Sequence, residues 1–323
     1  MITVEYIWLD GTTGTQQLRS KTRVFKSNPG QLPDWSFDGG STNQATVEQS
    51  DCILKPVRLY TDPFRQGEER YLALCEVLDK FGAPHISNTR ASLTKMHSEG
   101  THFGFEQEYT LIQPDGALLI PDGLEANHYY CGVGFGKTLG RALSDVHLEM
   151  CDKAGITLFG SNAEVMLSQW EFQTQPEEAL KASDDLWVSR FILERLGEGM
   201  EISISYHPKL SSEYNGAGCH TNFSTTATRA SWDGIEDVLE ALEDTHPDHM
   251  KVYGAENELR MTGTCETSKY DEFTAAEGDR TASVRIPPAT MINRCGYLED
   301  RRPAANCDPY IVTSRILETL IAC

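Results

Sequence analysis

The alternation of apolar and polar residues marks the first eighty residues as rich in strands. Such a period of two turns one set of side chains toward a core and the other toward solvent. Asp10 and Gly11 separate the first two alternating segments, which suits a hairpin. The pattern predicts strands over residues 3–9, 18–25, 51–60 and 69–78, and a glycine-bearing loop over 34–42.

In the rest of the chain, some segments have the apolar spacing of helices and others that of strands. The strongest pattern covers 176–196, where Pro176 suits a first helical turn and Gly197 follows the predicted end. Its predicted buried side chains are Leu180, Trp187, Val188, Phe191, Ile192 and Leu196. Further helices are predicted over 140–154 and 234–244, and a last one begins with Asp308 as its cap.

Turn-forming and polar residues cluster over 82–102, which indicates a domain boundary. We therefore expect one domain over 1–85 and a larger one over 86–323. Because strands and helices mix in the larger domain, its predicted class is α+β, a sheet with helices on one side.

Composition narrows the classes of function. The 323 residues are 39% hydrophobic and 24% charged, and no apolar run approaches the ~20 residues that span a bilayer. The amino terminus lacks the pattern of a signal peptide, and nine cysteines without C-x-x-C spacing favour a reducing cytoplasm. A net charge of −20 argues against nucleic acid or anionic membrane as a partner.

The segment 103–112 carries the most informative chemistry. As a strand, it places Glu106 and Glu108 on one face, about 7 Å apart, opposite a face of apolar residues and Gln107. Two such carboxylates repel each other unless a cation lies between them. A lone Glu-x-Glu is more often a solvated strand face, so the interpretation depends on other residues.

Two other segments supply candidate metal ligands. Glu164 and Glu171 are seven residues apart, and a turn near Leu167 and Ser168 would form a hairpin that brings both to one side. His220 follows a glycine loop and enters an alternating strand. A histidine in that context is more often a core residue than a ligand.

Arginines in distinctive segments complete the set. A planar guanidinium binds carboxylate or phosphate through two hydrogen bonds, which lysine cannot copy. Glu299 stands two residues before Arg301, on the same face if extended. Glutamates, one histidine and arginines together favour Mg²⁺ or Mn²⁺ beside phosphates, and predict a metal-dependent phosphoryl-transfer enzyme. The arginines are Arg260, Arg280, Arg285, Arg301 and Arg302.

Six segments, in this order, resemble type II glutamine synthetases, the eukaryotic-like form also found in some bacteria. The resemblance implies a small N-terminal β-grasp-like domain and a larger catalytic domain, in which helices back a curved antiparallel sheet. The segments are Trp35–Thr42, Phe103–Tyr109, Asn162–Gln173, Tyr214–Ser224, Ser283–Pro287 and Glu299–Tyr310.

The resemblance implies ligation of ammonia to the γ-carboxylate of L-glutamate, driven by ATP through γ-glutamyl phosphate. It assigns one metal, Mg²⁺ or Mn²⁺, to Glu108, Glu164 and Glu171, and a second to Glu106, His220 and Glu299.

The resemblance also assigns the substrate contacts and the catalytic groups. Asp38 would take a proton from ammonium, Glu266 would close a flap over the site, and Arg280 would stabilise the transferring phosphoryl group. The implied assembly is a decamer of two five-membered rings with shared active sites, in which Asp38 acts in trans. Glutamate would contact Asn215, Gly216, Arg260 and Arg301, and ATP would contact Glu106, Glu171, Asn222, Ser224, Arg280, Arg285 and Tyr297.

Three positions depart from the family pattern. Gly40 replaces a serine beside Asp38, Cys265 replaces a histidine of the flap, and Thr281 replaces a glycine after Arg280. Because they cluster where the amine would enter, a ligase of the same mechanism that uses another amine stays open. A non-catalytic regulatory homologue is a further alternative, disfavoured because the metal ligands and arginines are intact. A metal-dependent kinase is a weaker one.

Overall fold

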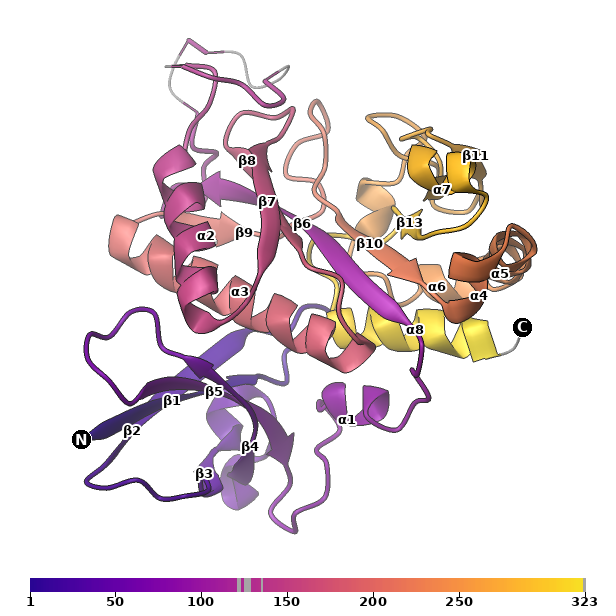
Figure 1. Cartoon of the computed structure of the whole chain (residues 1–323). Coiled ribbons are helices and arrows are strands. Elements are labelled where there is room, and N and C mark those ends of the chain that lie inside the picture. Colours follow the sequence, from indigo (N-terminus) through magenta and orange to yellow (C-terminus); the bar gives the residue numbers. More distant parts are fainter. Residues whose placement is uncertain (121–122, 125–128, 135, 322–323) are drawn as a thin grey trace. The chain divides into compact units, whose positions relative to one another are not determined.

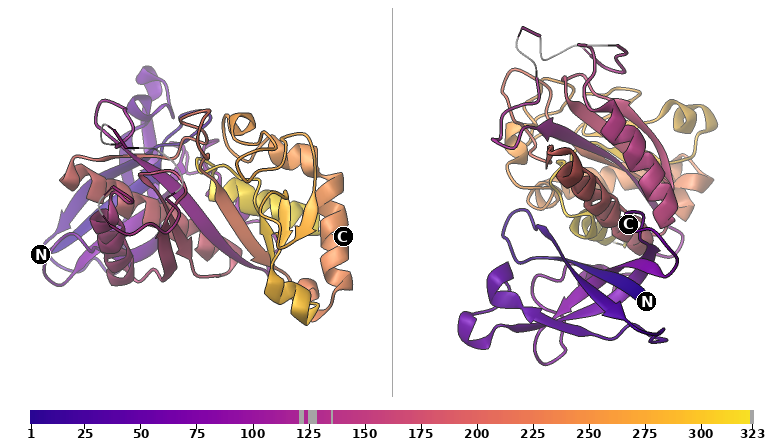
Figure 2. Two further views of the ribbon diagram at one scale, coloured as in Figure 1. Left: turned by 90° about the horizontal axis from the view of Figure 1, so that it is seen from above. Right: turned by 90° about the vertical axis from the view of Figure 1, so that its left-hand side faces the viewer.

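The computed structural model describes residues 1–120, 123–124, 129–134 and 136–321 (Figures 1 and 2). The chain divides into two compact units. Unit 1 comprises residues 1–95 and 149–156, and unit 2 comprises residues 96–148 and 157–323.

Unit 1 is built on a five-stranded sheet with the strand order β2-β1-β5-β4-β3. β1 pairs antiparallel with β2 and parallel with β5. The four strands predicted from alternation are confirmed, and a short helix, α1 (Arg90–Leu93), follows them. The strands are β1 (Ile2–Leu9), β2 (Leu18–Phe25), β3 (Trp35–Asp38), β4 (Asp51–Thr61) and β5 (Arg70–Leu78).

The predicted loop over 34–42 is partly wrong. Residues Trp35–Asp38 form β3, which pairs antiparallel with β4, and only Gly39–Thr42 form a turn, of the 3₁₀ type. Trp35 and Phe37 pack against the apolar cluster of unit 1, which includes Tyr6 and Trp8. Burial of these aromatic rings outweighs the turn-forming glycines that follow them.

Unit 2 is built on an eight-stranded sheet, with β6 (His102–Ile112) near its centre. Its pairings are antiparallel except for β11 with β12, in agreement with the expected α+β class. Along the sheet the order is β11-β12-β13-β10-β6-β8-β7, and β9 also pairs with β6. The other strands are β7 (Leu158–Ala163), β8 (Gln169–Thr174), β9 (Ser203–Ser205), β10 (Cys219–Ser224), β11 (Ala275–Glu277), β12 (Val284–Ile286) and β13 (Leu298–Asp300).

Helices pack against this sheet, and the long helix α3 (Ala179–Met200) contacts β6, β8, β9 and α8 (Figure 1). Among the helices that the structure describes, none is both long enough and apolar enough to cross a bilayer. The other helices are α2 (Arg141–Ala154), which has residues in both units, α4 (Thr226–Ala230), α5 (Asp233–Asp244), α6 (His246–Met250), α7 (Pro288–Asn293) and α8 (Pro309–Ile321).

The end predicted for α3 is wrong. The helix runs through Gly197 to Met200, and the C-cap residue Glu201 adopts a left-handed conformation with φ 56°. Gly197 is buried, and a Cβ there would stand 2.5 Å from the carbonyl oxygen of Ile202. This glycine therefore serves close packing rather than termination. Five of the six predicted core residues are buried, and Leu180 is half-buried.

Other local predictions are confirmed or shortened. The hairpin around Ser168 forms between β7 and β8, with Ser168 at φ 74°. Asp308 caps α8, because its Oδ1 accepts the backbone N–H of Tyr310 at 2.9 Å. The alternating residues 281–286 form a strand only at Val284–Ile286, in which Val284 and Arg285 pair with β13.

The two glycines near the end of α3 make a matched prediction. Gly197→Ala should lower the free energy of unfolding by about 1–3 kcal/mol, because its methyl group would press on the Ile202 carbonyl. Gly199→Ala has open space and should raise it by about 0.5–1 kcal/mol through helix propensity. Urea denaturation measures both, and equal effects of the two changes would contradict the packing role of Gly197.

Candidate active site

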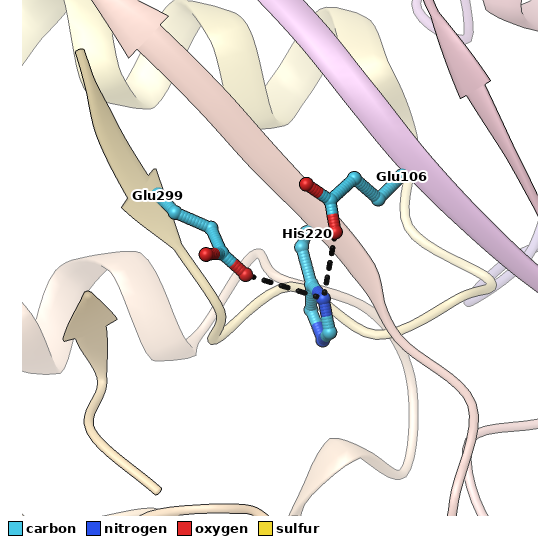
Figure 3. A group of neighbouring side chains, drawn as sticks. All are labelled: Glu106, His220 and Glu299. Carbon is cyan, nitrogen blue, oxygen red and sulfur yellow. Dashed lines mark ion pairs between the residues drawn. The ribbon is translucent and has the colours of Figure 1, made fainter. Parts of the chain in front are cut away.

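Three neighbouring strands of unit 2 each contribute one side chain to a compact group of donors. Glu106 on β6 lies opposite His220 on β10, and Glu299 comes from β13, on the other side of β10. Their side chains point toward one another, as Figure 3 shows. His220 Nδ1 lies 3.6 Å from Glu106 Oε2 and 3.7 Å from Glu299 Oε1. This is the group predicted for one metal.

A second group adjoins the first and shares His220. Glu108 on β6 lies directly opposite Glu171 on β8, and His220 Nε2 lies 3.8 Å from Glu108 Oε1. In each group the potential ligand atoms lie within 4.8 Å of one another. The resemblance implies Glu164 as the third ligand of this group; the compact set among the described residues contains His220, and Glu164 lines the same cavity as Glu108 and Glu171. Glu164 lies just after β7, where its Oε1 accepts a hydrogen bond from Asn162 at 2.9 Å.

Burial and mutual repulsion disfavour the ionised form of these carboxylates unless a cation binds them. Two effects raise the pKa of Glu108 to about 8: burial, which is the larger, and the negative charge of Glu164. Burial and the charges of Glu106 and Glu108 raise the pKa of Glu171 well above its usual range, and burial raises that of Glu164. Burial and the nearby Arg301 lower the pKa of His220 well below its ordinary value, so its ring is neutral. Hard oxygen donors with one neutral imidazole fit Mg²⁺ or Mn²⁺.

Arginines border the same carboxylates. Arg285 Nη1 and Arg301 Nη1 each lie 2.6 Å from an oxygen of Glu299. Arg301 Nε donates to the backbone oxygen of Arg280 at 2.9 Å, which ties together two of the predicted phosphate- and substrate-binding segments. Glu299 therefore belongs both to the donor group and to an arginine network.

Arg260 is more buried than Arg285 and Arg301. It is 3% exposed, and its Nη2 donates to the backbone oxygen of Arg301 at 2.6 Å. Burial lowers its pKa to about 10, so the side chain stays charged at neutral pH. A Cβ on Gly216 would stand 2.8 Å from Cγ of Arg260. The absence of a side chain at Gly216 therefore leaves room for Arg260 to pack against this loop.

All of these donors except Glu299 line a cavity of about 390 Å³. A second cavity of about 390 Å³ adjoins it, since Glu106 and Gln173 line both. Predicted residues on the first cavity are Glu106, Glu108, Glu164, Glu171, His220, Glu266, Arg280, Arg285 and Arg301. Predicted residues on the second are Glu106, Asn222, Ser224 and Tyr297.

Other predicted residues, Arg260 and Glu299 among them, do not line these cavities. Asn215 and Gly216 lie in the loop before β10, where the side chain of Arg260 packs against Gly216. Asp38 belongs to unit 1, where its Oδ2 accepts a hydrogen bond from Ser41 at 2.6 Å. That bond and the backbone N–H of Gly40 lower the pKa of Asp38, which keeps it a carboxylate.

Sequence reasoning missed several residues of the two cavities. Gln173 follows Glu171 by two positions on β8, so strand alternation could have identified it. Tyr130 lines the first cavity, and Arg229 lines the second, where its Nη1 donates to Ser224 Oγ at 2.8 Å. Neither of these two carries a pattern that marks it in the sequence.

Comparison with known proteins agrees with the geometry. Residues 1–80 match the family model "Glutamine synthetase, beta-Grasp domain", and residues 87–252 match "Glutamine synthetase, catalytic domain". A glutamine synthetase of Streptomyces viridochromogenes is 47% identical over 98% of this chain and 95% of its own length. One of Schizosaccharomyces pombe is 45% identical over 99% and 92%. A chloroplastic one of Chlamydomonas reinhardtii is 43% identical over 98% and 90%.

The raised pKa of Glu108 predicts how metal binding depends on pH. Between about pH 5 and 8 the folded, metal-free chain holds a proton that the unfolded chain has lost, so its stability falls as pH rises. A divalent cation binds the ionised carboxylate, so its affinity rises over the same window. Saturating Mg²⁺ should therefore raise Tm by more at pH 8 than at pH 6, as measured by scanning calorimetry.

Glu108→Gln is the control, since it removes the titrating group and should reduce the pH dependence of the Mg²⁺-induced shift. An equal shift at both pH values in the unsubstituted protein would contradict the prediction.

Proposed function

The chain belongs to the glutamine synthetase family, and on that premise we propose that it ligates ammonia to the γ-carboxylate of L-glutamate. ATP would drive the reaction, and the products would be L-glutamine, ADP and phosphate. The observation that carries the proposal is the junction of two cavities at Glu106, one lined by acidic and basic side chains and one with Tyr297 and Phe159.

ATP would lie across this junction. Asn222, Ser224 and Tyr297 suit the base and ribose in the second cavity, and the phosphates would reach past Glu106 into the first. There Arg280 and Arg285 provide positive charge where negative charge develops during phosphoryl transfer. Arg301 in the same cavity, with Arg260 behind it, would bind the carboxylates of glutamate.

The reaction would have two steps. A γ-carboxylate oxygen of glutamate attacks the γ-phosphorus of ATP, and the bond to the leaving ADP oxygen breaks, which gives γ-glutamyl phosphate. The nitrogen of ammonia then attacks the acyl carbon, the carbon–oxygen bond to phosphate breaks, and the amide loses its extra proton. Arginine side chains hold the reacting groups side by side, which lowers the entropic barrier.

The donor groups would hold two divalent cations, Mg²⁺ or Mn²⁺. Glu106, His220 and Glu299 suit one, and Glu108 and Glu171, with Glu164 nearby, suit the other. Bound cations would neutralise the phosphates and relieve the repulsion among the carboxylates.

Two acidic residues have proposed roles in amine chemistry. Glu266 lines the first cavity from a loop in which Cys265 and Glu266 both have positive φ, 53° and 61°. It would close the site and exclude water from the acyl phosphate. Asp38 would attract ammonium and accept its proton, in trans, within a homo-oligomer that we expect to be a decamer of two five-membered rings in the cytoplasm.

Two alternatives remain in the proposal. Thr281 closes the turn before β12 by donating to Asp279 through both its N–H and its hydroxyl, at 2.8 Å each, which the glycine of the family pattern could not do with a side chain. With Gly40 and Cys265, this change favours testing other amines as the nucleophile. A non-catalytic homologue is disfavoured by the assembled donor groups and arginines.

The direct test is phosphate release by the purified protein with ATP, Mg²⁺ and glutamate, comparing ammonium with methylamine and larger amines. We expect release that depends on ammonium, with glutamine as the product. Release with another amine alone would move the function to a γ-glutamyl-amine ligase. No release by the assembled oligomer would leave the non-catalytic reading.

Arg260→Lys tests the assignment of glutamate. Lysine keeps the charge and loses the two-pronged geometry, which costs about 1.5–3 kcal/mol per charged hydrogen bond. KM for glutamate should rise about 10–100-fold, while KM for ATP stays nearly constant. Arg195→Lys, at a surface ion pair with Glu198, is the matched control and should change neither constant. Equal rises in both KM values would argue against the assignment.

A further inference from the structure

The strand that carries Glu299 has a second, hidden ion pair on its rear face. On the side of the site, Glu299 pairs with Arg301, as described above. On the opposite side, Asp300 accepts from Arg302 through two oxygens, with Nη2 to Oδ2 and Nε to Oδ1 both at 2.8 Å. Both rear side chains are 0% exposed. Charges without access to water need a full set of hydrogen-bond partners from the protein.

A chain of hydrogen bonds supplies partners to Asp300. The hydroxyl of Tyr253 donates to Asp300 Oδ2 at 2.8 Å. His249 Nδ1 lies 2.5 Å from the same hydroxyl oxygen, and His249 Nε2 lies 2.7 Å from Thr319 Oγ1. The chain thus runs from α8 through α6 and Tyr253 to the rear of β13.

The hydrogen bonds between Thr319 and Asp300 all have the same donor-to-acceptor direction. Burial opposes ionisation of Asp300, but Arg302 outweighs it and lowers the pKa of that carboxyl, so Asp300 only accepts. The Tyr253 hydrogen is therefore committed to Asp300, and its oxygen accepts from His249 Nδ1–H. Burial and the charge of Arg302 lower the pKa of His249 to about 3, so the ring is neutral and Nε2 accepts from the hydroxyl of Thr319.

Arg302 is held from the same helix. Its Nη1 lies 3.0 Å from His246 Nδ1, and a guanidinium can only donate, so Nδ1 accepts. His246 Nε2 then carries the hydrogen and donates to the backbone oxygen of Tyr270 at 3.0 Å. Both members of the rear ion pair are therefore fixed by side chains that touch neither of the two cavities.

We propose that Tyr253 and His249 are positioning residues for Glu299 and Arg301. Asp300 shares its peptide bonds with both of them, so holding Asp300 rigidly fixes where the Glu299 carboxylate and the Arg301 guanidinium stand on the other face. The inference rests on the proposed function, in which Glu299 holds a divalent cation and Arg301 binds glutamate. Networks of this kind behind a ligand set its orientation.

The test compares two tyrosines of unit 2 in the full chain. Tyr253→Phe removes the hydroxyl that reaches Asp300, and leaves Arg302 in place on that carboxylate. Tyr270→Phe is the matched control, because its hydroxyl donates to the backbone oxygen of Met250 at 2.9 Å and does not reach β13. Binding of Mn²⁺ is measured by isothermal titration, and Glu299→Gln identifies the class of sites to which Glu299 belongs.

Tyr253→Phe should weaken Mn²⁺ binding at the Glu299-dependent class about tenfold and raise KM for glutamate, with KM for ATP unchanged. Tyr270→Phe should alter neither, although each variant loses one hydrogen bond and should have a lower Tm in its metal-free form. Unchanged Mn²⁺ affinity in Tyr253→Phe, or an equal loss in both variants, would overturn the proposal.

Two different variants distinguish failure of the metal assignment from failure of the positioning role. If Glu299→Gln leaves Mn²⁺ binding intact, the metal assignment itself fails, and the positioning role falls with it. If Tyr253→Phe does not fold, His249→Gln breaks the chain one residue further from β13. It should give a smaller loss of Mn²⁺ affinity, and no loss would again overturn the proposal.

Discussion

Repulsion among buried carboxylates is the constraint on which the rest of unit 2 depends. Glutamates on neighbouring strands face one another at β-sheet spacing, and burial leaves them little water. Without compensation they take up protons, as the raised pKa of Glu108 indicates. The structure compensates on one side with arginines, two of which hold Glu299, and it leaves a donor set suited to divalent cations for the remainder.

The alternation of strand side chains lets one strand serve both the site and its support. On β6, Glu106 and Glu108 face the site while Gln107 points to the rear, where it accepts from the buried Arg190 at 2.8 Å. On β13, Glu299 faces the site while Asp300 is anchored behind. These two acidic strands are thus held by hydrogen bonds on their opposite faces, which fixes their positions against the repulsion in front.

Much of this could be predicted from the sequence because it depends on periodicity. Alternation identified β1, β2, β4 and β5, and it placed the carboxylates of β6 on one face. Features that depend on close packing could not be predicted from the sequence. Gly197 reads as a helix terminator but sits inside α3, and His220 joins Glu108 and Glu171 because of strand register rather than spacing. His246 and His249, on a helix of one turn, carry no pattern that reveals their partners.

The two donor groups should together bind two divalent cations. The most direct measurement is the number of Mn²⁺ ions bound per chain, by equilibrium dialysis, in the unsubstituted protein and in Glu171→Gln. Because Glu171 belongs to only one group, we predict two ions per chain in the unsubstituted protein and one in Glu171→Gln. A count of zero, or a count that Glu171→Gln leaves at two with unchanged affinity, would contradict it.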